Sequence, residues 1–432
     1  MHELTRRRIC RVAFVVLCAL PTSGILAWGA ARRSPARLAA HVAELERAIG
    51  LPISVEAVSY PRPGATLLHS LELHDPETGA AMLTCRLLEV ASDGDRCVLR
   101  ASSAEIDAAF VPQLWQALER RLRRTAHDAD PPWSLVAREL TWRGPHAAQT
   151  FTDLAGQLVA DDSVHRAELA FHLAGASADE MIAVRASRRA ADRPGATNVT
   201  LDTGHGSLPA NVFVPLVEAA ACLGARAEFR GKLSIDLRPT GWAGHLAGEF
   251  DAVDLDSLVS AQFPHTLSGA ATLRVDHAQL DQGRLVEAAA GVSAGPGVIS
   301  RSLLVSAGSM LGLFDRDTMI PASQHLPFDR MTFDVTIDEA GLRFLGLAPC
   351  NTRGAMLVDT SATGQPRALW TQPERQPQPV VALLRALVPE SEVQVPATRE
   401  SDWLIHHLPV PPLAAPAANV ASPPTGHLRS LK

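Results

Sequence analysis

The chain has 432 residues, of which 47% are hydrophobic and 20% are charged, and this balance excludes a disordered protein. The formal net charge is −6 and no basic face stands out along the body of the chain, so nucleic acid is not expected as a partner. A chain of this length leaves room for two or three domains.

An uncharged stretch near the N-terminus, residues 12–31, is the most distinctive feature of the sequence. As a helix rising ~1.5 Å per residue it would cross the ~30 Å hydrocarbon core of a bilayer once. Four arginines between positions 6 and 11 precede it, and such residues stay on the cytoplasmic side. We therefore expect residues 1–33 to be a basic segment and a single-pass anchor in the inner (cytoplasmic) membrane, with the body exported to the periplasm. A cleaved signal peptide with residues 12–20 as its apolar part is the alternative.

Three elements are expected in the next region, residues 34–130. Apolar residues recur at helical spacing in SPARLAAHVAELERAIG (34–50), whose final glycine occupies the position where a helix commonly ends. Two alternating runs flank the turn-forming residues 75–79, which predicts a β-hairpin. VPQLWQALERRLRR (111–124) has one apolar face and a basic last turn, which predicts a second helix.

Four cysteines lie in the body of the chain, and none forms a CxxC pair or has a histidine at zinc spacing. No metal site and no cofactor is therefore predicted. A disulfide between Cys85 and Cys97 stays open as an alternative. If Asp93-Gly94 is a two-residue hairpin turn, Val90 lies opposite Cys97 and the two sulfur atoms are kept apart, which favours buried, unpaired thiols.

Residues 131–371 contain one alternating apolar and polar run after another, as half-buried strands require. The clearest runs are SLVARELTWRG (134–144), HRAELAFHLAG (165–175), AEFRGKLSIDL (227–237), ATLRVDH (271–277) and MTFDVTIDE (331–339). Helices are predicted between and after them at residues 211–223, 255–262, 299–313 and 380–387. The expected class is α+β: a single membrane helix followed by a body dominated by antiparallel sheet, with packed amphipathic helices.

The C-terminal part is expected to be less regular. The segment QPERQPQP (372–379) is typical of a linker, so residues 372–408 are expected to form a linker and a helix. Residues 409–432 are rich in proline and alanine, which predicts a disordered tail.

Two of the strands nearly repeat each other, 38 positions apart in the sequence. Gly231 and Gly269 are each followed by apolar residues at every second position, so that each strand has one apolar side. Such a side must be covered by helices, by another sheet or by something other than protein. The candidates to line an apolar groove are, by this alternation, Leu233, Ile235, Leu237, Leu273 and Val275.

Two well-known catalytic motifs are absent from the sequence. It has no phosphate-binding loop with a lysine and no H-E-x-x-H pair, and we do not predict an enzyme. An enzyme whose active-site residues are dispersed along the chain stays as a third hypothesis, because catalytic groups converge in space and not in sequence.

The arrangement resembles the AsmA-like group of bacterial envelope proteins, to which TamB-like proteins are related. The resemblance lies in the anchor (12–31), in GEFDAVDLDSLV (248–259) and in LSGAATLRVDHAQLDQGRLVEAAAGVSAGPGVIS (267–300), where a strand after a glycine is followed by a polar turn and another strand. It implies a role in envelope maintenance, outer-membrane assembly or phospholipid movement through an apolar groove. The alternative is a membrane-tethered structural or protein-interaction module whose sheet is covered by its own helices and whose partners are other envelope proteins.

Overall fold

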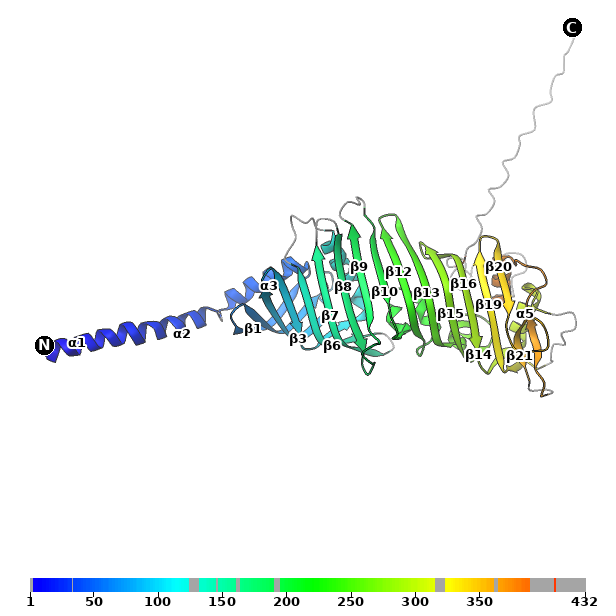
Figure 1. Ribbon diagram of the computed structural model, residues 1–432, viewed down its shortest axis with the longest axis horizontal. Helices are drawn as coiled ribbons and strands as arrows, with labels where there is room; N and C mark the ends of the chain where they lie inside the picture. The colour runs from blue at the N-terminus through cyan, green and yellow to red at the C-terminus, as the bar shows by residue number, and fades with distance from the viewer. Residues whose placement is uncertain are drawn as a thin grey trace, which may run out of the picture.

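The computed structural model describes residues 3–32, 34–123, 132–144, 147–160, 164–189, 195–314, 323–360, 364–388 and 408. Within these ranges an N-terminal helical segment leads to the β1 end of a long row of strands (Figure 1). The expected α+β class, with an N-terminal apolar helix and a strand-rich body, is confirmed.

The N-terminal segment is one continuous run of α1 (Glu3–Phe14), the π-helical η1 (Val15–Ala19) and α2 (Leu20–Arg32). The wide π turn lies just before Pro21, whose ring would clash with a carbonyl in the preceding turn of a regular α-helix. Residues Arg7–Ala27 are long and apolar enough to cross a membrane, and none of that span is buried against the body. A single-pass anchor and a signal sequence both fit this helix.

Most of the body is one large sheet. Its strands are β1 (Ile53–Arg62), β2 (Ala65–His74), β3 (Ala81–Asp93), β4 (Arg96–Ala101), β5 (Ala104–Asp107), β6 (Trp133–Arg143), β7 (Ala148–Ala160), β8 (Val164–Leu173), β9 (Ile182–Arg189), β10 (Thr197–Asp202), β11 (Leu208–Pro209), β12 (Glu228–Arg238), β13 (Gly241–Asp254), β15 (Ala270–Asp281), β16 (Arg284–Ala294), β19 (Arg330–Asp338), β20 (Gly341–Gly346), β21 (Ala355–Asp359) and β22 (Arg367–Thr371). A small second sheet comprises β14 (Leu267–Ser268), β17 (Gly297–Ser300) and β18 (His325–Phe328).

Strands that follow each other along the chain are mostly neighbours in the large sheet, as Figure 1 shows. The meander continues through β10, β12, β13, β15, β16 and β19 to β20. All five strands predicted from alternation are present, as β6, β8, β12, β15 and β19. Alternation located them because each has one face against the core and one face in water.

The helices of the body are α3 (Pro35–Ile49), η2 (Ala108–Phe110), α4 (Val111–Leu122), η4 (Ala210–Phe213), η5 (Glu218–Leu223), η6 (Asp256–Ser260), α5 (Arg301–Met310) and α6 (Val380–Leu387). α3 ends where predicted, because Gly50 adopts a left-handed conformation with φ 80°. The helix predicted over 211–223 is instead two short 3₁₀ segments, since Pro215 lies between them and interrupts the helical hydrogen bonds. The helix predicted from residue 299 begins at Arg301, because Ile299 and Ser300 belong to β17.

One junction of the sheet is parallel, which the expectation of an antiparallel sheet did not include. β4 and β5 both run parallel to β6. A parallel pair needs a connection that returns the chain to the same end of the sheet, and α4, predicted simply as a helix, lies in that connection.

The loop of the hairpin between β3 and β4 lies one residue later than predicted, which moves the partner of Cys97 by two residues, from Val90 to Ser92. Ser92 lies opposite Cys97, so the two-residue loop is Gly94-Asp95, with Gly94 at φ 66° in the first loop position as in a type II′ turn. Cys85 lies opposite Ala104 of β5. Both cysteines are free, as the unpaired-thiol prediction requires, and burial raises the pKa of each thiol.

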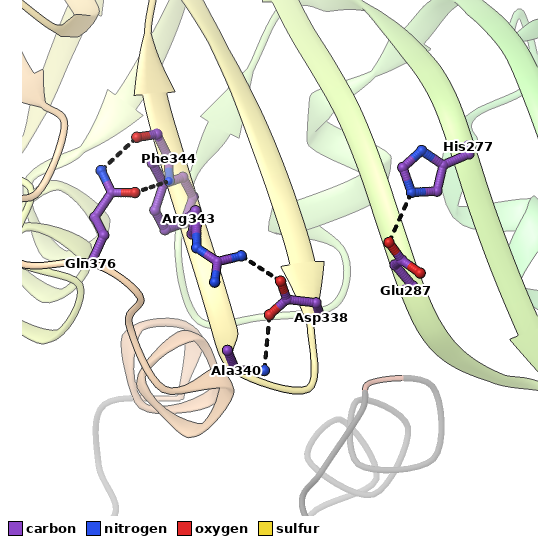
Figure 2. Close-up of polar contacts among 7 residues, drawn as sticks. All are labelled: His277, Glu287, Asp338, Ala340, Arg343, Phe344 and Gln376. Atoms are coloured by element: carbon purple, nitrogen blue, oxygen red, sulfur yellow. Dashed lines mark hydrogen bonds and ion pairs between the residues drawn. The ribbon is translucent and has the colours of Figure 1, made fainter.

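The segment 372–379, predicted to be a linker, lies along β20. The backbone of Gln378 forms two hydrogen bonds with that of Leu342, each of 2.7 Å. The side-chain amide of Gln376 brackets Phe344: it donates to the carbonyl oxygen at 2.7 Å and accepts from the N–H at 3.0 Å (Figure 2). The segment therefore behaves as an additional edge of the sheet. The predicted tail, residues 409–432, lies outside the described residues.

Candidate functional site: the apolar face of the sheet

One face of the large sheet is polar and is tied together by charged pairs between neighbouring strands. Lys232 and Asp202 lie directly opposite each other, with 3.0 Å between ammonium nitrogen and carboxylate oxygen. Figure 2 shows two further pairs, His277 with Glu287 and Arg343 with Asp338. The hydrogen bond from Arg343 lowers the pKa of Asp338. This face is solvated, and its pairs favour the observed strand register.

The opposite face is apolar, and strand pairing places all five candidate residues on it. Residues directly opposite one another on paired strands point to the same side. One row across β12, β13 and β15 is Phe229, Phe250 and Leu273; the next is Gly231, Gly248 and Val275; a third is Leu233, Leu246 and Ala278. Ile235 and Leu237 continue the β12 side of the same face.

The middle row requires glycine. Gly231 and Gly248 lie opposite each other, and a Cβ atom on Gly231 would lie 2.3 Å from the carbonyl oxygen of Ala247. The glycine that begins the sequence repeat therefore lets two strands approach closely at the centre of the apolar face.

The five candidates differ in how much of their surface remains accessible. Val275 is 7% exposed and packs with Ala278 and Ala288, so it belongs to the core. The other four are half-buried. Leu237 borders a cleft of about 470 Å³ whose lining also includes Trp115 of α4. The apolar face is thus partly open and partly covered by the protein's own helices.

Packed aromatic rings cover the apolar face of the sheet near its middle. Phe229 is 1% exposed, and its ring centroid lies 5.9 Å from that of Phe213 and 4.9 Å from that of Phe250. Phe250 also packs against the C-terminal core, the buried cluster that includes Ile299, Leu304 and Leu357. These rings join the core clusters of the two halves of the body.

Helices α3 and α4 cover the apolar face at the β1 end and leave two clefts. The cleft beside α3 has a volume of about 870 Å³ and a mixed lining that includes His41, Arg47 and Arg96. The cleft beneath α4 has a volume of about 360 Å³ and is lined mainly by leucines: Leu73, Leu99, Leu114, Leu135, Leu158 and Leu169. An apolar chain fits the second lining, and a molecule with a polar end fits the first.

A stacked arginine–tryptophan pair lies beside these clefts. Trp133 borders both of them, and the Arg121 guanidinium lies 3.8 Å from the centroid of its ring. Arg121 also donates a 2.6 Å hydrogen bond to the carbonyl oxygen of Ala48 in α3. No sequence pattern indicates these clefts as such, although the amphipathic pattern of α4 and the alternation at 134–144 each predict one of the walls.

No group of His, Cys, Asp and Glu side chains that could hold a metal ion occurs within the described ranges. A scan against protein-family models and searches of curated proteins and of solved structures found no match to this chain. The resemblance to AsmA-like proteins therefore stays a prediction that rests on the residues quoted for it.

Proposed function

We propose that this protein is a membrane-anchored envelope protein of the AsmA-like type whose apolar sheet face holds or passes phospholipid. The observation that carries the proposal is the half-buried apolar row Leu233, Ile235 and Leu237 on a sheet whose other face is polar. Acyl chains are the cover that a membrane offers to such a row.

The position of the sheet supports this proposal. Only residues 33 and 34 separate α2 from α3, so the covalent chain keeps the start of α3 within ~11 Å of the end of the membrane-crossing segment. From the arginines that precede the uncharged stretch we infer that the N-terminus lies in the cytoplasm and the body in the periplasm. In this arrangement the clefts at the β1 end lie nearest the membrane, where a lipid would enter.

Photocrosslinking of the full-length chain in cells tests the proposal. A benzophenone side chain at Ile235 is expected to form adducts with phospholipid, because Ile235 lies on the apolar face. The same group at His245, which is exposed on the polar face one position from the partner of Ile235, is the matched control. Mass spectrometry of the purified chain measures the adducts. Equal lipid labelling at both positions, or none at Ile235, contradicts the proposal.

A second function, a membrane-tethered protein-interaction module, is favoured by one observation. The aromatic cluster around Phe229 and the packing of α3 and α4 already cover part of the apolar face. In that case the Ile235 crosslinker would capture no lipid, and the chain purified without detergent would carry no stoichiometric phospholipid in native mass spectrometry.

A further inference from the structure

A cleft with several serines in its lining lies at the far end of the body from the membrane helix, where β17 leads into α5. It has a volume of about 710 Å³, and its lining includes Pro264, Ser300, Ser302, Ser309 and Met310. Ser302 is the second residue of α5 and is exposed. It lies apart from the half-buried apolar row of β12.

Behind Ser302 lies a buried histidine. His265 is 5% exposed, and its Nδ1 atom lies 3.0 Å from the hydroxyl oxygen of Ser302. Its Nε2 atom lies 3.1 Å from the carbonyl oxygen of Ala386. A carbonyl only accepts, so Nε2 carries the proton and Nδ1 is the acceptor of a neutral imidazole. The hydroxyl group of Ser302 therefore donates a hydrogen bond to Nδ1 of His265.

The contacts of the neighbouring Ser300 are consistent with a hydrogen bond donated by Ser302 to His265. Its hydroxyl oxygen accepts hydrogen bonds from the backbone N–H groups of Thr266 and Leu303, at 3.1 and 3.3 Å. With both lone pairs engaged, its own proton points to the oxygen of Ser302, 3.0 Å away. A chain of hydrogen bonds thus runs from Ser300 through Ser302 to His265 and on to Ala386.

The two helix ends favour separation of charge along this chain. Ala386 lies in the last turn of α6, where carbonyl groups stabilise a positive charge on His265. Ser302 lies in the first turn of α5, where its backbone N–H has no acceptor within the helix and stabilises a negative charge. Burial lowers the pKa of His265, which keeps the imidazole neutral and able to accept a proton at neutral pH.

We propose that Ser302 is a nucleophile and His265 its general base, for acyl transfer from carboxylic esters that enter the cleft. Ser302 Oγ bonds to the ester carbonyl carbon while its proton moves to Nδ1 of His265. The carbon–oxygen bond to the alcohol then breaks, and that alcohol takes the proton from His265. Water attacks the acyl-serine with the same base, which releases the carboxylic acid and returns the proton to Ser302 Oγ.

The test is covalent labelling of the full-length chain with a fluorophosphonate probe. Labelling is expected on the peptide that contains Ser302, and Ser302→Ala removes it. Ser309→Ala is the matched control, because Ser309 is exposed in the same cleft and on the same helix, and its hydroxyl bonds to the carbonyl of Ser306 instead of a histidine. Hydrolysis of p-nitrophenyl acetate by the same variants gives a second readout and is expected to follow the labelling.

His265→Gln tests the role of the base. It is expected to slow labelling of Ser302 by about 10²-fold or more, since a positioned general base contributes ~10²–10⁴-fold. Thermal unfolding of each variant shows whether the fold is kept. If His265→Gln does not fold, labelling of Ser302 and Ser309 in the wild-type chain decides whether the proposal holds. A folded wild-type chain that is unlabelled, or labelled equally at Ser302 and Ser309, overturns the proposal and leaves His265 as a structural link between α5 and α6.

Discussion

Removal of the chain from residue 372 onward is expected to unfold the C-terminal half of the body. The truncation takes away the strand-like segment that pairs with Leu342, and with it α6. Val380 and Leu384 of α6 are buried, and burying one such side chain contributes about 1.5–3 kcal/mol. Loss of the two side chains alone costs roughly 3–6 kcal/mol, against a typical total stability of about 5–15 kcal/mol. Limited proteolysis and the amount of soluble chain measure the effect.

The same segment offers a matched control. Glu374 lies within it but is exposed, so Glu374→Ala is expected to change the stability by less than about 0.5 kcal/mol. The sequence division at residue 371 predicts the opposite result for the truncation, because a linker and an isolated helix are dispensable to the core. A truncated chain with wild-type resistance to protease would show that the linker prediction was right.

Local patterns predicted the elements whose signals are themselves local. Alternation located β6, β8, β12, β15 and β19 because half of each strand faces water. α6 has the predicted bounds, Val380–Leu387, because its apolar run is short and Pro379 disfavours a helical conformation at the residue before it.

Long-range pairing was not predictable in this way. The composition of 372–379 is typical of a linker. The side-chain amide of Gln376 nevertheless forms two hydrogen bonds with the backbone of Phe344, 32 positions earlier, as a neighbouring strand would. The parallel junction at β6 depends likewise on partners across a crossover, which no window of sequence contains. Both features are held by hydrogen bonds between segments that are distant in the chain.

The candidate site shows the same division between local and long-range signals. Alternation placed Leu273 and Val275 on one face, but a bulge after Val275 puts two successive polar residues, Asp276 and His277, on the other face. Strict alternation would have aimed His277 at the apolar side, away from Glu287. The pairing of Ser302 with His265 lies beyond any local pattern, since 37 positions separate them and Ala386 lies 121 positions from His265.

Phe229→Ala is expected to destabilise the body by about 3–5 kcal/mol, the usual cost of deleting a buried phenylalanine ring. The ring is 1% exposed and lies between Phe213 and Phe250, so its loss leaves a cavity that the paired strands β12 and β13 cannot collapse to fill. Urea unfolding of the full-length chain in detergent micelles, followed by circular dichroism, measures the change. Leu345→Ala is the control, because Leu345 is 51% exposed.

The number of unfolding transitions of Phe229→Ala shows whether the aromatic rings on the apolar face couple the two core clusters. Phe229 belongs to the core cluster that includes Phe151, Phe171 and Ile182, and Phe250 packs against that cluster and also against the C-terminal core. If the aromatic rings join the two clusters, we expect the wild-type chain to unfold in one transition and the variant to unfold in two steps, with the half that contains β1 to β10 melting first. A variant that keeps one transition at the wild-type urea midpoint would mean that strand pairing alone couples the halves and that the rings contribute little to the sheet.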